Sequence, residues 1–268
     1  MITVFECPGT NVDATISGKM QYISPEEIAK GDFYNGLDKT AFDYVFIQGY
    51  ANNLKPLLPS VNSGVAIVTQ KIESTEGKFA LIGTSQGALI QSLVYKKLKN
   101  NEIAGRLSDC VGVFLFGNPA RESGKAFPGG PVAPGHGIAS AEYRLTGTLS
   151  DPLVWEFANP GDPVCTNGDD LASQIREDGF ESMLTSFDGN LNSISDVLQI
   201  AQDLAGWLSF GVLAAPGMAL FHNEYNSYTP IPGDSRSATQ IVVDHLNTIV
   251  GPYYRDDGWS TTLRVPGA

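Results

Sequence analysis

The fold is decided by the stretch Lys78-Phe-Ala-Leu-Ile-Gly-Thr-Ser-Gln-Gly-Ala-Leu-Ile-Gln-Ser-Leu-Val-Tyr-Lys-Lys-Leu98. Its continuous apolar run, Phe79 to Ile82, is too short for a buried helix and stops at a glycine, as is typical of a parallel strand covered on both faces. From Gln86 onward apolar residues recur every four positions, and two lysines fall in the last turn, where cations suit the helix dipole. The stretch therefore predicts a buried strand that leads directly into a helix.

The junction between strand and helix has the pattern G-x-S-x-G, in Gly83-Thr84-Ser85-Gln86-Gly87. This pattern places a serine on a sharp turn, and the flanking glycines leave room for a strained backbone. We expect the hydroxyl of Ser85 to be an exposed nucleophile and the amide of Gln86 to face a developing oxyanion. A purely structural turn is the alternative interpretation.

Length and charge limit the classes of function. The chain has 268 residues, 42% of them hydrophobic, which fits one large α/β domain with an insertion. It carries 17 basic and 29 acidic residues, a net charge of −12 and a pI near 4.6. This balance disfavours nucleic-acid binding by phosphate neutralisation and favours a neutral or surface-presented substrate.

Cysteine and histidine usage gives two further expectations. Three cysteines cannot all pair with one another, and no signal-peptide pattern follows Met1, so we expect the chain to be made and to fold in a cytoplasm. Any export would use another route. The three histidines and three cysteines are scattered without the spacing of a zinc site, so we expect no metal and no other cofactor.

Strands and helices alternate along the chain, which predicts a parallel sheet with helices on both faces. Further strands are expected at Ile2 to Phe5, Asp43 to Gln48, Val111 to Phe116 and Leu153 to Ala158, and helices at Ser60 to Glu73 and Ser237 to Val250. Residues 11 to 40 read as loop with one short helix at most. Residues 123 to 140 are rich in glycine and proline and predict an irregular excursion.

Two turns that follow strands carry candidate site residues. Gly9-Thr10 follows the first strand, where a serine hydrolase takes its second oxyanion donor, although a plain Pro-Gly turn explains the local sequence equally well. Asp162 follows a late strand, where an α/β-hydrolase places the carboxylate that orients its histidine. A turn aspartate that bonds its own backbone is the competing interpretation.

A serine nucleophile needs a histidine base, and three histidines are available. His136 precedes Asp162, which conflicts with the order Ser, Asp, His of α/β-hydrolases. His245 lies in the apolar stripe of the last helix, where packing alone explains it. His222, on an irregular stretch before that helix, is the candidate general base for Ser85 and Asp162.

The segment of about 169–221 is rich in Leu, Ile and Ala, and we interpret it as a helical insertion or cap within a single domain of residues 1–268. Its last part, Ala205 to Phe221, carries no charge. That part is too short for a comfortable membrane span and is broken by Pro216-Gly217, so no stable span is expected. It forms either the core of the insertion or an apolar wall for a long acyl chain.

Several motifs together resemble one family, the cutinases and phage lysin B esterases. Gly83 to Gly87 is similar to their G-Y-S-Q-G elbow, with Thr84 in place of tyrosine, and Gly9-Thr10 to their oxyanion turn. The segments that complete the resemblance are Gly161-Asp162-Pro163-Val164-Cys165, His222-Asn-Glu-Tyr225 and, closer to lysin B, Gly117-Asn118-Pro119-Ala120-Arg121.

The resemblance implies a cutinase-like α/β-hydrolase fold, a three-layer sandwich around a mostly parallel sheet. It also implies a serine esterase with Ser85, Asp162 and His222 as triad and Thr10 and Gln86 in the oxyanion hole. Lysin B enzymes cleave the ester between mycolic acids and arabinogalactan, so the implied partner is a lipid or mycolyl ester of the host envelope. No cysteine follows Cys165, so the cutinase disulfide at this position cannot form. That departure and the missing signal peptide favour a phage product, made in the host cytoplasm and acting on the envelope after release.

Two other classes of function fit the same residues. A tail or capsid component could use this fold to bind or open the host envelope during entry, and its sequence would retain the same triad. A non-catalytic carbohydrate- or lipid-binding descendant is the other alternative, which the presence of every catalytic residue type disfavours.

Overall fold

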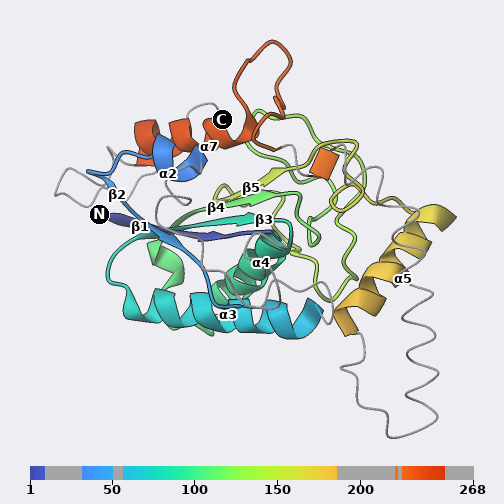
Figure 1. Ribbon diagram of the computed structural model, residues 1–268, viewed down its shortest axis with the longest axis horizontal. Helices are drawn as coiled ribbons and strands as arrows, with labels where there is room; N and C mark the ends of the chain where they lie inside the picture. The colour runs from blue at the N-terminus through green and yellow to red at the C-terminus, as the bar shows by residue number, and fades with distance from the viewer. Residues whose placement is uncertain (10–31, 51–56, 186–220, 223–224, 251–268) are drawn as a thin grey trace, which may run out of the picture.

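The computed structural model describes residues 1–9, 32–50, 57–185, 221–222 and 225–250. Its centre is a sheet of five parallel strands in the order β2-β1-β3-β4-β5 (Figure 1). The strands are β1 (Ile2–Cys7), β2 (Phe42–Phe46), β3 (Phe79–Thr84), β4 (Cys110–Phe116) and β5 (Val154–Phe157). Each strand expected from the sequence is present, and the parallel arrangement is confirmed.

The central strand β3 lies between β1 and β4, with Leu81 paired to Phe5 on one side and to Val113 on the other. Residues Phe79 to Ile82 are all buried. Because helices cover both faces of a parallel sheet, the side chains that point to either face are apolar. This double cover explains the continuous apolar runs in the sequence.

Helices on the two faces complete the three layers (Figure 1). On one face lie α3 (Leu57–Ser74) and α4 (Gln86–Lys99), and on the other α2 (Asp32–Gly36) and α7 (Ala238–His245). The predicted start of α3 at Ser60 is three residues late, because Pro59 is tolerated in the first turn of a helix. The predicted α/β-hydrolase architecture is confirmed.

The final helix differs from its prediction at the C-terminal end. It begins as expected at the cap Ser237, where Ser237 and Gln240 form a capping box. The α-helix ends at His245, and Leu246–Val250 is π-helical. The hydroxyl of Thr248 donates to the carbonyl of Asp244 at 2.5 Å, so it takes the acceptor that the Thr248 backbone N–H would use in an α-helix.

The expected excursion after β4 is irregular, and a buried arginine holds it to the turn after β5. The side chain of Arg121 is fully buried, and among the described residues it donates to backbone carbonyls. Nε reaches Cys165 O at 2.6 Å, and Nη2 reaches Pro134 O at 2.6 Å and Gly135 O at 2.8 Å. The last residue of the G-N-P-x-R segment therefore fixes the loop that contains Asp162.

The predicted insertion begins as a helix, α5 (Leu171–Thr185), which packs beside α3. Its continuation, including the uncharged stretch 205–220, lies outside the described residues, as do Thr10 and most of the loop predicted for 11–40. None of the described helices is long and apolar enough to cross a membrane.

Candidate active site

Ser85 lies at the sharp turn between β3 and α4 with φ 54° and ψ −118°. A positive φ is strained for a residue other than glycine. The turn is possible because its two glycines leave room for backbone. A Cβ at Gly83 would lie 2.5 Å from the carbonyl oxygen of Gly87, and a Cβ at Gly87 would lie 2.0 Å from that of Cys7. Both glycines of the G-x-S-x-G pattern are therefore required by contact.

A chain of hydrogen bonds joins the three residues that the sequence assigns to the triad. Ser85 Oγ lies 2.8 Å from His222 Nε2, and His222 Nδ1 lies 2.8 Å from Asp162 Oδ2. The imidazole and the carboxylate are almost completely buried. With the proton of His222 on Nδ1, where the carboxylate holds it, Nε2 is left to accept the serine proton. This arrangement can activate the hydroxyl of Ser85 as a nucleophile.

Asp162 is buried, yet several donors keep it ionised. Burial by itself raises the pKa of the Asp162 carboxyl, but the hydrogen bond and charge of His222 and the hydroxyl of Tyr225 outweigh it, so that the pKa is below its usual value. The backbone N–H of Val164 donates to Oδ1 at 2.9 Å. The carboxylate is therefore ready to stabilise an imidazolium at neutral pH.

The turn after β1 lies directly against the elbow. A Cβ at Gly9 would be 3.4 Å from the Cβ of Ser85, and a Cβ at Gly87 would be 2.6 Å from the carbonyl oxygen of Pro8. The buried hydroxyl of Tyr50 donates to that carbonyl at 2.9 Å. Gln86 opens α4 next to the serine, and its side-chain amide donates to Ser60 Oγ at 2.7 Å. Gly9, at the start of one candidate oxyanion segment, and Gln86, the other candidate, therefore both lie next to Ser85.

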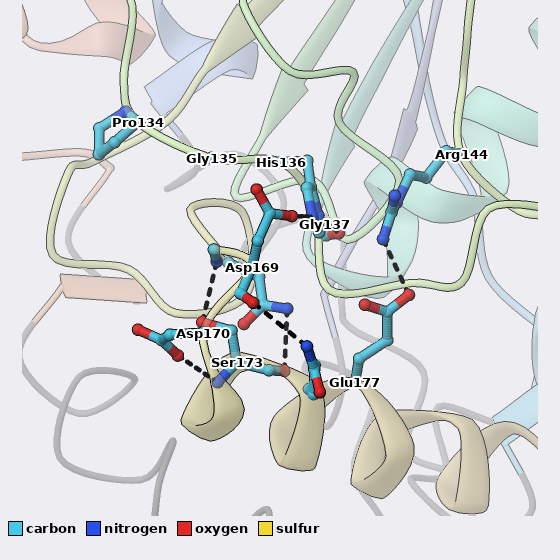
Figure 2. Close-up of polar contacts among 12 residues, drawn as sticks. Pro134, Gly135, His136, Gly137, Arg144, Asp169, Asp170, Ser173 and Glu177 are labelled. Carbon is cyan, nitrogen blue, oxygen red and sulfur yellow. Dashed lines mark hydrogen bonds and ion pairs between the residues drawn. The ribbon is translucent and has the colours of Figure 1, made fainter.

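The other two histidines take part in different contacts. Figure 2 shows His136 beside Asp169, which precedes α5, with 3.6 Å between Nε2 and Oδ1. The backbone of His136 also pairs with Asn167. His245 packs on Trp155 with 4.2 Å between ring centroids, as the apolar stripe of its helix predicts. Of the three histidines, His222 is the one in hydrogen-bond contact with Ser85.

Three features of the site were not recognised in the sequence. In the sequence Tyr225 is only the last residue of the His222-Asn-Glu-Tyr225 segment, but its hydroxyl donates to Asp162 Oδ2 at 2.7 Å. Gly117 has φ 55° and lies against the rings of His222 and Tyr225. Glu156, in the middle of β5, is buried and accepts a hydrogen bond from Asn118. Two signals in the sequence point to them. Glu156 is a charged residue inside an apolar strand, and Gly117 is a glycine directly after an apolar strand.

Metal ligands do not gather in the part of the chain that the structure describes. It contains no group of three or more His, Cys, Asp or Glu side chains that could hold a metal ion. The three cysteines are all buried and unpaired.

Solved structures resemble the chain, whereas no protein-family model and no curated protein matches it. Lysin B from Mycobacteriophage D29 matches 91% of this chain and 98% of its own, with a TM-score of 0.63 and 23% sequence identity. A cutinase-like protein from Cryptococcus sp. matches 81% of this chain and 95% of its own, with a TM-score of 0.45 and 14% identity. The chain therefore shares the α/β-hydrolase fold of lysin B, as its motifs predicted.

Proposed function

We propose that the protein is a serine carboxylic-ester hydrolase with Ser85 as nucleophile, His222 as general base and Asp162 as the carboxylate that orients it. One observation carries the proposal. The strained serine between β3 and α4 is joined through a buried imidazole to a buried carboxylate by two hydrogen bonds of 2.8 Å. Such a nucleophile, base and orienting group is the combination that acyl transfer requires.

The reaction follows from this geometry. Ser85 Oγ attacks the ester carbonyl carbon while its proton passes to His222 Nε2, and Asp162 stabilises the resulting imidazolium. The tetrahedral oxyanion is stabilised by the amide of Gln86 and, in this proposal, by Thr10. When the ester C–O bond breaks, His222 gives its proton to the leaving alcohol. Water then attacks the acyl carbon while His222 takes its proton, and when the bond to Ser85 Oγ breaks, His222 returns that proton to Oγ and the acid is released.

We propose a lipid ester of the host cell envelope as substrate, and specifically the ester between mycolic acids and arabinogalactan. The proposal rests on the sequence motifs and on the shared fold with a phage lysin B. Incubation of isolated mycobacterial-type envelopes with the protein should release free mycolic acids, measured by mass spectrometry. Hydrolysis of simple esters without any release from envelopes would restrict the protein to another ester.

The nucleophile is tested with Ser85→Ala. The wild-type protein should hydrolyse p-nitrophenyl esters and bind one phosphonate per chain, whereas the variant should do neither and unfold at the same temperature. The change removes one hydroxyl from a surface turn, so the fold does not depend on it. Activity that survives in highly purified Ser85→Ala protein would overturn the assignment.

The same activity would serve host lysis or phage entry. The two roles differ in whether the protein is part of the phage particle. We propose action on the envelope after release of the protein from the host cytoplasm. Detection of the chain in purified phage particles by mass spectrometry would instead assign it to the virion.

A further inference from the structure

Asp162 Oδ2, the oxygen that bonds to His222, is shared with other donors. His222 Nδ1 lies 2.8 Å from it, the Tyr225 hydroxyl 2.7 Å and the thiol of Cys165 3.2 Å. The Oδ1 atom accepts the backbone N–H of Val164. A triad needs only the histidine contact on this oxygen, so the second strong donor requires an explanation.

The direction of the Tyr225 hydrogen bond is set by its surroundings. The phenolic oxygen accepts the backbone N–H of Asn159 at 3.1 Å and lies 3.3 Å from Cys165 Sγ. Its own proton goes to Asp162 Oδ2, which is the nearer acceptor and the charged one. Burial, followed by the charge of Asp162, raises the pKa of the Tyr225 phenol well above its usual value. Tyr225 is therefore a neutral donor throughout the pH range in which an esterase works.

The ring of Tyr225 is fixed as firmly as its hydroxyl. It is buried and meets the ring of Phe116 edge-on, with 6.1 Å between centroids. A Cβ at Gly117 would lie 2.9 Å from Tyr225 Cε2 and 2.9 Å from His222 Cε1. The phenol and the imidazole thus occupy the space that the glycine leaves, and they converge on the same carboxylate oxygen.

We propose that Tyr225 is a positioning residue that holds Asp162 Oδ2 toward His222 and disperses the carboxylate charge, and that it thereby widens the pH range in which Ser85 reacts. This inference rests on the proposed function, in which neutral His222 is the base. A carboxylate that donates part of its charge density to a phenol attracts an imidazolium less strongly. Tyr225 therefore extends the activity of Ser85 toward acid.

The other groups around Asp162 in the described residues do not provide this dispersal at Oδ2. The backbone N–H of Val164 donates to the other oxygen, Oδ1. Burial, and after it the charge of Asp162, raises the pKa of Cys165 well above its usual value, so its thiol is neutral and a weak donor. The guanidinium of Arg121 donates its hydrogen bonds to backbone carbonyls, with Nε bonded to Cys165 O. The hydroxyl of Tyr225 is the strong donor that remains besides the histidine.

Tyr225→Phe removes the donor and keeps the ring. We expect the acid limb of the pH dependence of kcat/KM for a p-nitrophenyl ester to move to higher pH by about half a unit or more, because the imidazolium is then better stabilised. The rate of phosphonate labelling of Ser85 should shift in the same way. Plateau kcat should fall by up to about tenfold, the value of one hydrogen bond.

Tyr228→Phe is the matched control, because Tyr228 lies three residues later, packs against Tyr225 and sends its hydroxyl to the carbonyl of Ala158 at 3.5 Å. Its acid limb should stay in place. Incorporation of 3-fluorotyrosine at position 225 provides a variant of nearly unchanged shape with a stronger donor, and it should move the limb to lower pH. Opposite shifts in the two Tyr225 variants cannot result from general loss of packing.

An unmoved acid limb in both Tyr225 variants would overturn the inference. Titration of the His222 ring by NMR gives a second readout that needs no turnover, and it should shift in the same directions. If Ser85 of the wild-type protein fails to react with phosphonate, the proposed function fails, whereas reactive Ser85 with an unchanged profile in the variants defeats only the role of Tyr225.

Discussion

The ring of His222 lies so close to the backbone of Gly117 that no side chain fits between them. A Cβ at position 117 would be 2.9 Å from Cε1 and 3.0 Å from Nδ1 of the imidazole. The glycine follows β4 with φ 55°, and its N–H donates to the carbonyl of Phe157 on β5. The sheet itself therefore forms the surface against which the histidine is held.

We expect Gly117→Ala to lower kcat by on the order of 10²-fold, because displacement of a catalytic group by about an ångström has this cost. Gly124→Ala is a control for backbone strain, since Gly124 also has a positive φ, 83°, but a Cβ there would meet only Leu149 at 3.5 Å. Both variants should lose stability, measured by urea unfolding. Equal loss of kcat in both would show that the contact with His222 is unimportant.

The choice between His222 and His245 is the second prediction. His222→Ala should reduce kcat by several orders of magnitude, as removal of a triad member does, and should slow phosphonate labelling of Ser85. His245→Ala should change kcat little, because its ring packs on Trp155 and Phe114. The reverse pattern would show that the base lies in α7.

Local patterns were enough to predict the sheet and the elbow. A run such as Phe79 to Ile82 is apolar because both of its faces are covered, and the two glycines around Ser85 are required by contacts within the turn and with the strand beside it. The order of the residues along the chain and their loop positions also selected Asp162 and His222. These choices depend on general rules of the fold and not on details of packing.

Long-range polar contacts could not be predicted in the same way. Tyr225 and Asp162 are separated by 63 positions, and Asn118 and Glu156 by 38. Sequence shows that a charge interrupts an apolar strand, but not which side chain will meet it. The role of Gly117 was missed for the same reason, since its neighbours come from a segment more than a hundred residues later.

Tyr50 anchors the turn that is expected to carry the second oxyanion donor, through its hydrogen bond to the carbonyl of Pro8. We expect Tyr50→Phe to lower kcat by up to about tenfold with little change in KM, because the loosened turn stabilises the oxyanion less well. Tyr95→Phe is the control. It removes a comparable hydroxyl, bonded to Asp151 at 2.7 Å, ten residues beyond Ser85. A kcat loss in both variants would argue for a general effect on the fold.

Glu156 should make the protein less stable as pH rises. Burial raises its pKa to about 8, against the hydrogen bond from Asn118 and the charges of Arg121 and Lys125. In the unfolded chain Glu156 releases its proton near pH 4.5. The stability that the protonated Glu156 gives the folded protein is therefore complete below that pH and is lost as pH rises through 8. Glu156→Gln, which mimics the protonated acid, should be more stable than wild type at pH 8 by on the order of 3 kcal/mol.

Glu122 is the control of opposite sign for that measurement. Burial raises its pKa, but hydrogen bonds from the Thr148 and Gly147 backbone outweigh this effect, so the pKa lies below its usual value. Its contribution is present at neutral pH and is lost in acid. Glu122→Gln should therefore be less stable than wild type at pH 8. If both glutamine variants lose stability at pH 8, Glu156 is ionised in the folded protein.

His245 should make the protein sensitive to acid without affecting catalysis. Burial beside Trp155 lowers its pKa to about 4, whereas an unfolded histidine titrates near pH 6.5. Between these values the unfolded chain binds the proton and the folded protein does not, so stability falls as pH drops from 6.5 toward 4. His245→Phe keeps an aromatic ring against Trp155 and removes the titration. The variant should gain on the order of 2 kcal/mol over wild type in urea unfolding between pH 7 and pH 5, with kcat at pH 7 unchanged. A constant difference between the two proteins across that range would show that His245 takes up its proton at the same pH in the folded protein as in the unfolded chain.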